Sequence, residues 1–306
     1  MATAGRGGGS FILTIPAIYG WSFGGAALAL CLNLREGAAR RSPVESKARA
    51  GPETVIANAN PTATTSPGTT NAPAWAAGMR RLTDYLVLDF LGGPRPWKFA
   101  WVINFQKAGT FVFLLGLIAW YGNTATNVWI YTAMQGSYGI VWILKDVAFP
   151  DPNWQRRITI GGGINAFLGV LGWYWVFGWL LISGVSQPDY PLPDYAWYCL
   201  CISLCIVGCV IMIAADAQKF YTLRVQRGLI TDGMHRYVRH PNYLGEIMIY
   251  GSFALMVWHW LPVVVLAWVW IGLFAVNMVM KEASMSRYPE WAAYKKRTWW
   301  LVPFVL

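Results

Sequence analysis

The chain has 306 residues, of which 56% are hydrophobic and only 12% are charged, and its mean hydropathy is +0.39. A soluble protein of this length would not carry so much apolar surface, so these values predict an integral membrane protein. The formal net charge of +10 does not indicate nucleic acid binding, because the basic residues flank apolar runs and no base-reading module is present.

The first third of the sequence contains one apolar stretch and a polar linker. Residues 11–34 are apolar and long enough to span a bilayer, so 1–34 reads as a retained anchor or as a targeting segment. Within the linker, 35–97, the Thr-, Pro- and Ala-rich part at 61–73 cannot bury enough surface to order itself. Residues 79–90 have the spacing of a short amphipathic helix at the membrane surface.

Six further apolar runs predict transmembrane helices, which makes the fold an all-α polytopic transmembrane bundle of about seven spans. We expect the second to fourth spans within residues 98–196. Lys107 lies inside one run, where a lysine is unfavourable unless it faces a partner or water, or snorkels to the interface, so it is a candidate site residue. The runs are 99–121, 128–144, 158–182, 195–215, 243–260 and 261–280.

Cysteine usage argues against a disulfide scaffold. Cys201, Cys205 and Cys209 recur every four residues in one apolar run and therefore share a helix face. No histidine or carboxylate accompanies them there, so we interpret them as packing residues and expect no metal site.

The distribution of basic residues predicts the orientation of the chain. With seven spans, every Lys and Arg except Arg6 and Lys107 falls on one side of the membrane. The positive-inside rule then places the amino end outside or in a lumen, and the C-terminal region in the cytosol. We expect the membrane to be that of the endoplasmic reticulum or another organelle.

The stretch 228–246 concentrates the polar chemistry between two apolar runs. Its arginines repel each other unless an anion lies between them, and guanidinium groups match phosphate or carboxylate oxygens in pairs. Gly233 permits a tight turn, and Pro241 can begin a helix at its first position. Topology signalling or headgroup contact is the simpler alternative for the basic residues. The charged and imidazole side chains are Asp232, His235, Arg236, Arg239, His240 and Glu246.

Residues 239–246, RHPNYLGE, resemble the RHPxYxG signature of two related groups of membrane enzymes. One is the steroid 5α-reductase and sterol C14-reductase group, and the other is the isoprenylcysteine and phospholipid methyltransferase group. The resemblance covers about residues 197–306, which it identifies as a reductase-like C-terminal catalytic domain with a cofactor-binding helical region.

The resemblance implies two alternative activities at the same site. A reductase would bind NADPH from the cytosol and transfer hydride to a conjugated carbon–carbon double bond of a lipid or steroid-like substrate within the bilayer. A methyltransferase would bind S-adenosylmethionine, but where that group carries two glutamates this chain has Lys281 and Glu282. Glu246, directly after a glycine, looks like the reductase form, so we favour the reductase.

The residues that the resemblance assigns are these. Catalytic roles fall to Tyr243 and Glu246, and cofactor binding falls to Arg224, Arg236, Arg239, His240, Asn242, Lys281, Glu282, Tyr294 and Arg297.

A third interpretation is a catalytically inert membrane subunit of a larger complex. The linker and the N-terminal anchor would suit such a role. The intact motif at 239–246 argues against it, because an inert scaffold has no physical need for that cluster. The oligomeric state is left open.

Overall fold

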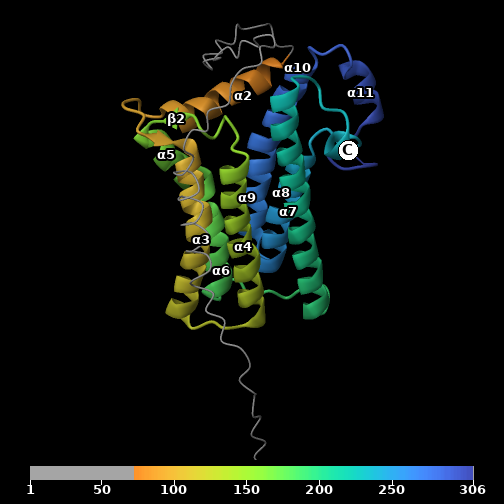
Figure 1. Ribbon diagram of the computed structural model, residues 1–306. Coiled ribbons are helices and arrows are strands. Elements are labelled where there is room, and N and C mark those ends of the chain that lie inside the picture. Colours follow the sequence, from red (N-terminus) through yellow and green to blue (C-terminus); the bar gives the residue numbers. More distant parts are fainter. Residues whose placement is uncertain (1–71, 306) are drawn as a thin grey trace, which may run out of the picture. The chain divides into compact units, whose positions relative to one another are not determined.

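The computed structural model describes residues 72–305, and these are mostly helical (Figure 1). The predictions for 1–34 and for residues 35–71 of the linker lie outside the described residues. In chain order the elements are α2 (Ala74–Asp84), η1 (Tyr85–Asp89), β1 (Trp97–Lys98), α3 (Phe99–Tyr121), α4 (Thr126–Ala148), β2 (Arg157–Ile158), α5 (Ile160–Ala166), η2 (Phe167–Leu171), α6 (Trp173–Ile182), α7 (Asp194–Val225), η3 (Gly233–His235), α8 (Pro241–Val257), α9 (Trp260–Val269), η4 (Trp270–Ala275), α10 (Val276–Met285) and α11 (Trp291–Arg297).

Three helical stretches are long and apolar enough to cross a bilayer: α3, α7 and Trp260–Met285, which joins α9, η4 and α10. A fourth arises if Ile160–Leu171 and Trp173–Ile182, bent by 41°, are counted as one span. The predicted helical fold is therefore confirmed, with at least three helices suited to a membrane. Each apolar run between residues 99 and 280 is helical, although not each one meets the criteria for a span by itself.

Turn chemistry sets several helix boundaries. Gly122, with φ 66°, ends α3 in the left-handed region that glycine adopts without strain. Pro241 occupies the first turn of α8, as the sequence predicts. The short turn at Trp258 and His259 then joins α8 to α9, and the His259 side chain accepts from the Leu261 N–H to begin the new helix.

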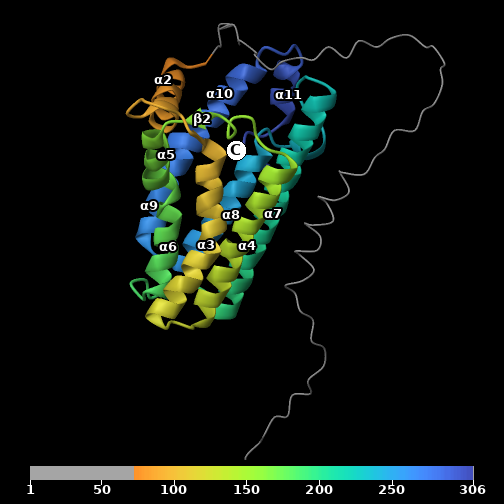
Figure 2. The ribbon, with the colours of Figure 1, turned by 60° about the vertical axis from the view of Figure 1, so that its left-hand side comes forward.

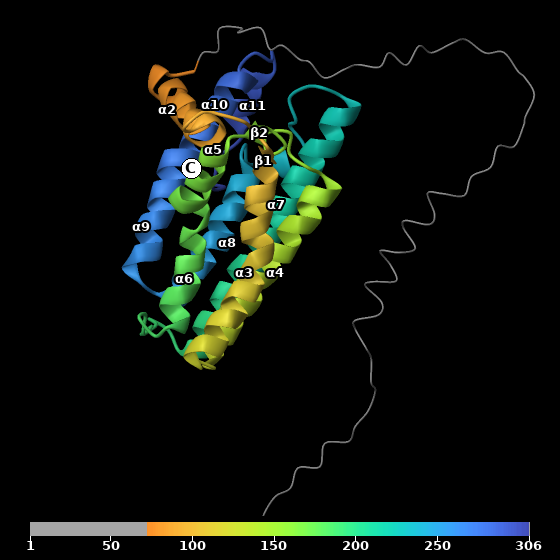
Figure 3. The same ribbon diagram turned by 90° about the vertical axis from the view of Figure 1, so that its left-hand side faces the viewer.

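The core lies between α3, α4, α6, α7 and α8, which run side by side in all three ribbon views (Figures 1, 2 and 3). Glycines allow the closest contacts: a Cβ on Gly139 of α4 would lie 2.2 Å from the Lys107 carbonyl oxygen of α3. Cys201 and Cys205 are buried in this core, as expected of packing residues.

One end of the bundle carries the short polar elements α2, β1, β2, α10 and α11 (Figure 3). Helix α2 and the π-helical turn η1 together correspond to the surface helix predicted at 79–90, but α2 begins five residues earlier, at Ala74. Arg80 of α2 pairs with Asp84 at 3.1 Å and donates to the Asn277 side chain of α10 at 2.5 Å. The hydrogen bond to Asn277 connects α2 to the first turn of α10.

Candidate functional site

Residues 226–240, the motif loop, connect α7 to α8 and make hydrogen bonds to elements on both sides. On the α7 side, the Gln218 side chain accepts from the Met234 N–H at 2.8 Å, next to Gly233 with φ 54°. On the other side, the Tyr294 hydroxyl of α11 donates to the His235 carbonyl at 2.7 Å. The loop and the C-terminal tail, about sixty residues apart in sequence, therefore form one structural unit.

Glu282 of α10 is the centre of a compact set of charges, the Glu282 cluster, made of Arg239, His240, Glu282 and Lys295. Arg239 Nε lies 2.5 Å from Glu282 Oε1, and the same guanidinium donates to the Thr298 carbonyl at 2.5 Å. His240 Nε2 lies 3.7 Å and Lys295 Nζ 3.5 Å from the Glu282 carboxylate. The Arg239 side chain is only 8% exposed. Two predicted cofactor ligands, Arg239 and Glu282, thus neutralise each other.

Lys281, the neighbour of Glu282, contacts the aromatic ring of Tyr243 and not the Glu282 cluster. Its ammonium lies 4.5 Å from the centre of the Tyr243 ring, which packs edge-on against Phe274. Within residues 72–305, no ion pair includes Lys281. A cation without a carboxylate partner therefore lies beside the first turn of α8.

Glu246 lies one turn further along α8 and is half-buried. It makes no ion pair within the described part of the chain. The charged groups that act on it are Lys145, Asp216, Lys107 and Lys281, and the first two are paired with each other. Glu246 is thus a carboxylate among charges from four other helices, and it remains available to a ligand.

Three of the predicted cofactor ligands are exposed arginines outside this buried group. Arg224, Arg236 and Arg297 each place the guanidinium over a nearby ring, at 3.9, 5.3 and 5.8 Å from the ring centres. Asn242 is half-buried in the first turn of α8. The structure therefore brings together Arg239, His240, Tyr243, Lys281, Glu282 and Tyr294, and leaves the three arginines at the surface.

Burial controls the protonation of the two histidines in the loop. Burial, together with the neighbouring His240, lowers the pKa of His235 to about 4. Burial also lowers the pKa of His240, although Glu282 opposes this shift. Both imidazoles are therefore neutral at pH 7, and the cationic charge of the motif comes from its arginines.

This protonation predicts a loss of stability in acid. Because the folded-state pKa of His235 lies below the unfolded value of about 6.5, the unfolded chain binds more protons between those values. The stabilising contribution is complete above about pH 6.5 and falls as the pH drops toward 4. We expect the melting temperature in detergent to fall between pH 7 and pH 4.5, and to fall less for His235→Asn. An identical pH profile for this variant would contradict the assignment.

A second polar group, which the sequence indicated only in part, lies deeper in the bundle. Lys107 does not snorkel, because its side chain is buried and its ammonium donates to the Tyr250 hydroxyl at 2.8 Å. The lysine within an apolar run was the only signal in the sequence. Tyr138, Tyr174 and Tyr250 gave none, because aromatic residues in such runs are ordinary packing residues.

Comparison with known proteins locates the similarity in the C-terminal half. Residues 151–298, just under half of the chain, match the family described as DUF1295, a protein of unknown function. An uncharacterised protein of Schizosaccharomyces pombe, C7D4.09c, is 31% identical over 93 residues, which are 29% of this chain and 30% of that protein. The chain thus matches less than a third of that relative's length. The family match contains α7, the motif loop and α11, but not Lys107 or Tyr138.

Proposed function

We propose that the protein is a membrane-embedded NADPH-dependent reductase of a carbon–carbon double bond in a lipid or steroid-like substrate. The observation that carries this proposal is the unpaired ammonium of Lys281 beside Tyr243, next to the buried Glu282 cluster. A cation in that position favours an anionic cofactor, because burying it without a counter-ion is unfavourable.

The exposed arginines supply the phosphate ligands in this proposal. Arg236 follows His235, whose carbonyl accepts from Tyr294, and Arg297 lies over the ring of that same tyrosine. The two guanidinium groups therefore belong to neighbouring elements that are tied together. Arg224 adds a third cation at the end of α7. Such a set suits the pyrophosphate and the additional phosphate of NADPH.

The chain's own residues then orient the cofactor and complete the proton balance. Reduced nicotinamide, when bound, supplies a hydride to one carbon of the double bond. The second carbon must receive a proton. Tyr243 and Glu246 lie within one turn of each other on α8, and a phenol or a protonated carboxyl is the type of group that delivers it. The Glu282 cluster keeps this end of α8 fixed against α10 and the tail.

The alternative cofactor, S-adenosylmethionine, fits these charges less well. It carries a sulfonium and an ammonium, and both would lie near Lys281 instead of a second glutamate. S-adenosylmethionine also has no phosphate groups, so it would leave the three exposed arginines without a ligand. The charge distribution therefore favours the reductase.

The proposal includes seven spans, with residues 197–306 as the catalytic domain on the cytosolic face of the endoplasmic reticulum or another organelle membrane. It is supported by the position of the basic helices α2 and α11 at one end of the bundle (Figure 1), because the positive-inside rule assigns basic elements to the cytosol.

Cofactor binding provides the test. We expect NADPH to raise the melting temperature of the detergent-solubilised protein, since a ligand at a hundred times its Kd stabilises the folded form by about 2.7 kcal/mol. Arg236→Ala and Arg297→Ala should reduce this shift, whereas Arg81→Ala, at an exposed arginine of α2, should not. NADPH oxidation should then depend on a conjugated enone lipid.

Two other outcomes would reject the reductase. A shift with S-adenosylmethionine and none with NADPH would select the methyltransferase. No shift with either would favour an inert subunit of a larger complex.

A further inference from the structure

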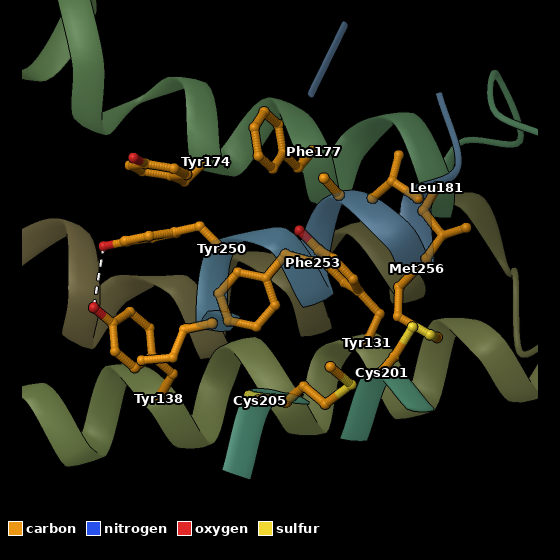
Figure 4. Close-up of a cluster of buried hydrophobic side chains, with 14 of the residues drawn as sticks. Tyr131, Tyr138, Tyr174, Phe177, Leu181, Cys201, Cys205, Tyr250, Phe253 and Met256 are labelled. Atoms are coloured by element: carbon orange, nitrogen blue, oxygen red, sulfur yellow. Dashed lines mark hydrogen bonds between the residues drawn. The ribbon is translucent and has the colours of Figure 1, made fainter. Parts of the chain in front are cut away.

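A chain of three hydrogen-bonding groups, the interior donor cluster, crosses the middle of the bundle. It consists of Lys107 on α3, Tyr250 on α8 and Tyr138 on α4. The lysine ammonium lies 2.8 Å from the Tyr250 hydroxyl. That hydroxyl lies 3.1 Å from the hydroxyl of Tyr138, a contact drawn as a dashed line in Figure 4. All three residues are at most 5% exposed. The cluster joins the consecutive helices α3 and α4 to α8, which lies more than a hundred residues later in the sequence.

Aromatic rings surround the ammonium of Lys107. It lies 4.7 Å from the ring centre of Tyr138, 4.9 Å from Tyr250, 5.2 Å from Tyr174 and 5.4 Å from Trp142. Tyr174 in turn stacks on Tyr250, with the ring centres 4.5 Å apart (Figure 4). Ring faces attract a cation, so this arrangement offsets part of the cost of burying the ammonium.

Among the described residues the cation nevertheless makes no ion pair, and the Glu246 carboxylate of α8 acts on it only from beyond ion-pair distance. Within residues 72–305, no carboxylate lies within ion-pair distance of Lys107, whereas Lys145, two turns along α4 from Tyr138, is paired with Asp216. A charge inside a membrane protein is unfavourable unless it has a partner or a function. The contrast between the two lysines indicates that a partner for Lys107 comes from outside the chain.

A count of donors and acceptors leads to the same conclusion. An ammonium has three N–H donors and no acceptor, and only one of them meets an oxygen, that of Tyr250. The two phenols carry two O–H groups, of which only one can lie between their oxygens. The other O–H has no acceptor within the described residues. The cluster therefore has donors and positive charge, and it lacks an acceptor oxygen.

Other buried polar atoms in this interior are also without partners. Tyr131 Oη and Gln135 Oε1, both on α4, are buried and make no hydrogen bond within the described part of the chain. Gln135 donates its amide to the carbonyl of Tyr174, whose ring faces Lys107. Buried polar groups in folded proteins almost always find a partner. Among residues 72–305, the Tyr131 hydroxyl lacks an acceptor, as the cluster does, whereas the Gln135 oxygen is itself an acceptor and needs a donor.

We propose that the interior donor cluster binds an anionic oxygen of a bilayer-resident ligand, the carboxylate of a long-chain fatty acid. The carboxylate neutralises Lys107 and accepts from the free phenolic O–H, and the acyl chain stays among apolar helices. Conformational opening between the helices is required, because the cluster is closed in this structure. The inference does not depend on NADPH binding.

Oleate is the probe, and its methyl ester is the matched neutral ligand. We expect oleate to raise the melting temperature of the full-length protein in detergent, and methyl oleate to have little effect. Lys107→Met should weaken oleate binding at least about tenfold, since a hydrogen bond to a charged group contributes more than a factor of ten. Lys219→Met, at a partly exposed lysine of α7, should leave the oleate shift unchanged.

Conservative variants keep the proposal testable if Lys107→Met does not fold. Tyr138→Phe and Tyr250→Phe retain the rings and remove the phenolic donors, so each should weaken oleate binding while methyl oleate stays inactive. Equal shifts with oleate and its ester, no oleate shift, or an unchanged oleate shift in folded Lys107→Met would overturn it. Arg236→Ala should leave the oleate shift intact, which separates this result from failure of the NADPH proposal.

Discussion

Glu282→Ala is expected to destabilise the folded protein by about 3–5 kcal/mol, because it leaves a buried guanidinium without its counter-ion. The Arg239 side chain is 8% exposed, and its other partners are the carbonyls of Lys295 and Thr298 and the Thr298 hydroxyl, which cannot neutralise a charge. Lys295 and His240 would also lose their contacts with the carboxylate. Chemical unfolding in detergent measures the change.

A compensating variant distinguishes a structural pair from a cofactor site. Arg239→Met combined with Glu282→Leu removes both charges, and replacing a buried ion pair with apolar side chains is often nearly neutral. The double variant should therefore be much more stable than Glu282→Ala. If the Glu282 cluster also positions the cofactor, the stable double variant should no longer respond to NADPH. Equal instability of the single and double variants would show that charge compensation is not the reason for the pairing.

This experiment bears on how a motif should be interpreted from sequence. Grouped arginines in residues 228–246 predict an external anion because like charges at this spacing repel each other. The structure provides an internal one, Glu282, which lies 43 residues after Arg239. Sequence reasoning selected both residues but assigned both to the cofactor, because pairing across that separation is a tertiary fact.

Helix starts were predictable to within a few residues because the length of an apolar run and its proline or glycine boundaries are local properties. The polar end of α7, which continues ten residues past the predicted run 195–215 to Val225, was not predicted. The run 99–121 coincides with α3, and Pro241 begins α8 as expected. The π-helical turns η1, η2 and η4 were not predicted. They depend on how neighbouring helices pack, and the periodicity of an apolar run carries no sign of them.

The interior donor cluster marks the limit of prediction from one sequence. Lys107 was identifiable because a lysine in an apolar run is rare. Its partners Tyr138 and Tyr250 are ordinary aromatic residues of other runs, and their roles depend on the rotation of α4 and α8 about their axes. Apolar runs that are hydrophobic on all sides give no moment from which that rotation could be inferred.

Gly245→Ala is expected to have the second large effect, because α7 and α8 touch through their backbones. A Cβ at Gly245 would lie 2.6 Å from the Gly208 carbonyl oxygen and 2.7 Å from the Met212 nitrogen. Backbone atoms cannot move aside as a flexible side chain can, so the two helices must separate. Overpacking of this kind costs roughly 1–3 kcal/mol, occasionally more.

Separation of α7 from α8 should also displace the candidate site, since Gly245 lies between Tyr243 and Glu246 on α8. We therefore expect Gly245→Ala to lower the melting temperature and to weaken the NADPH shift together. Gly116→Ala is the matched control: it replaces a helical glycine of α3 with nothing within 4 Å of the added carbon. That change should be neutral or slightly stabilising, because alanine favours helix by about 1 kcal/mol over glycine. Equal behaviour of the two variants would mean that α7 and α8 do not require this close contact.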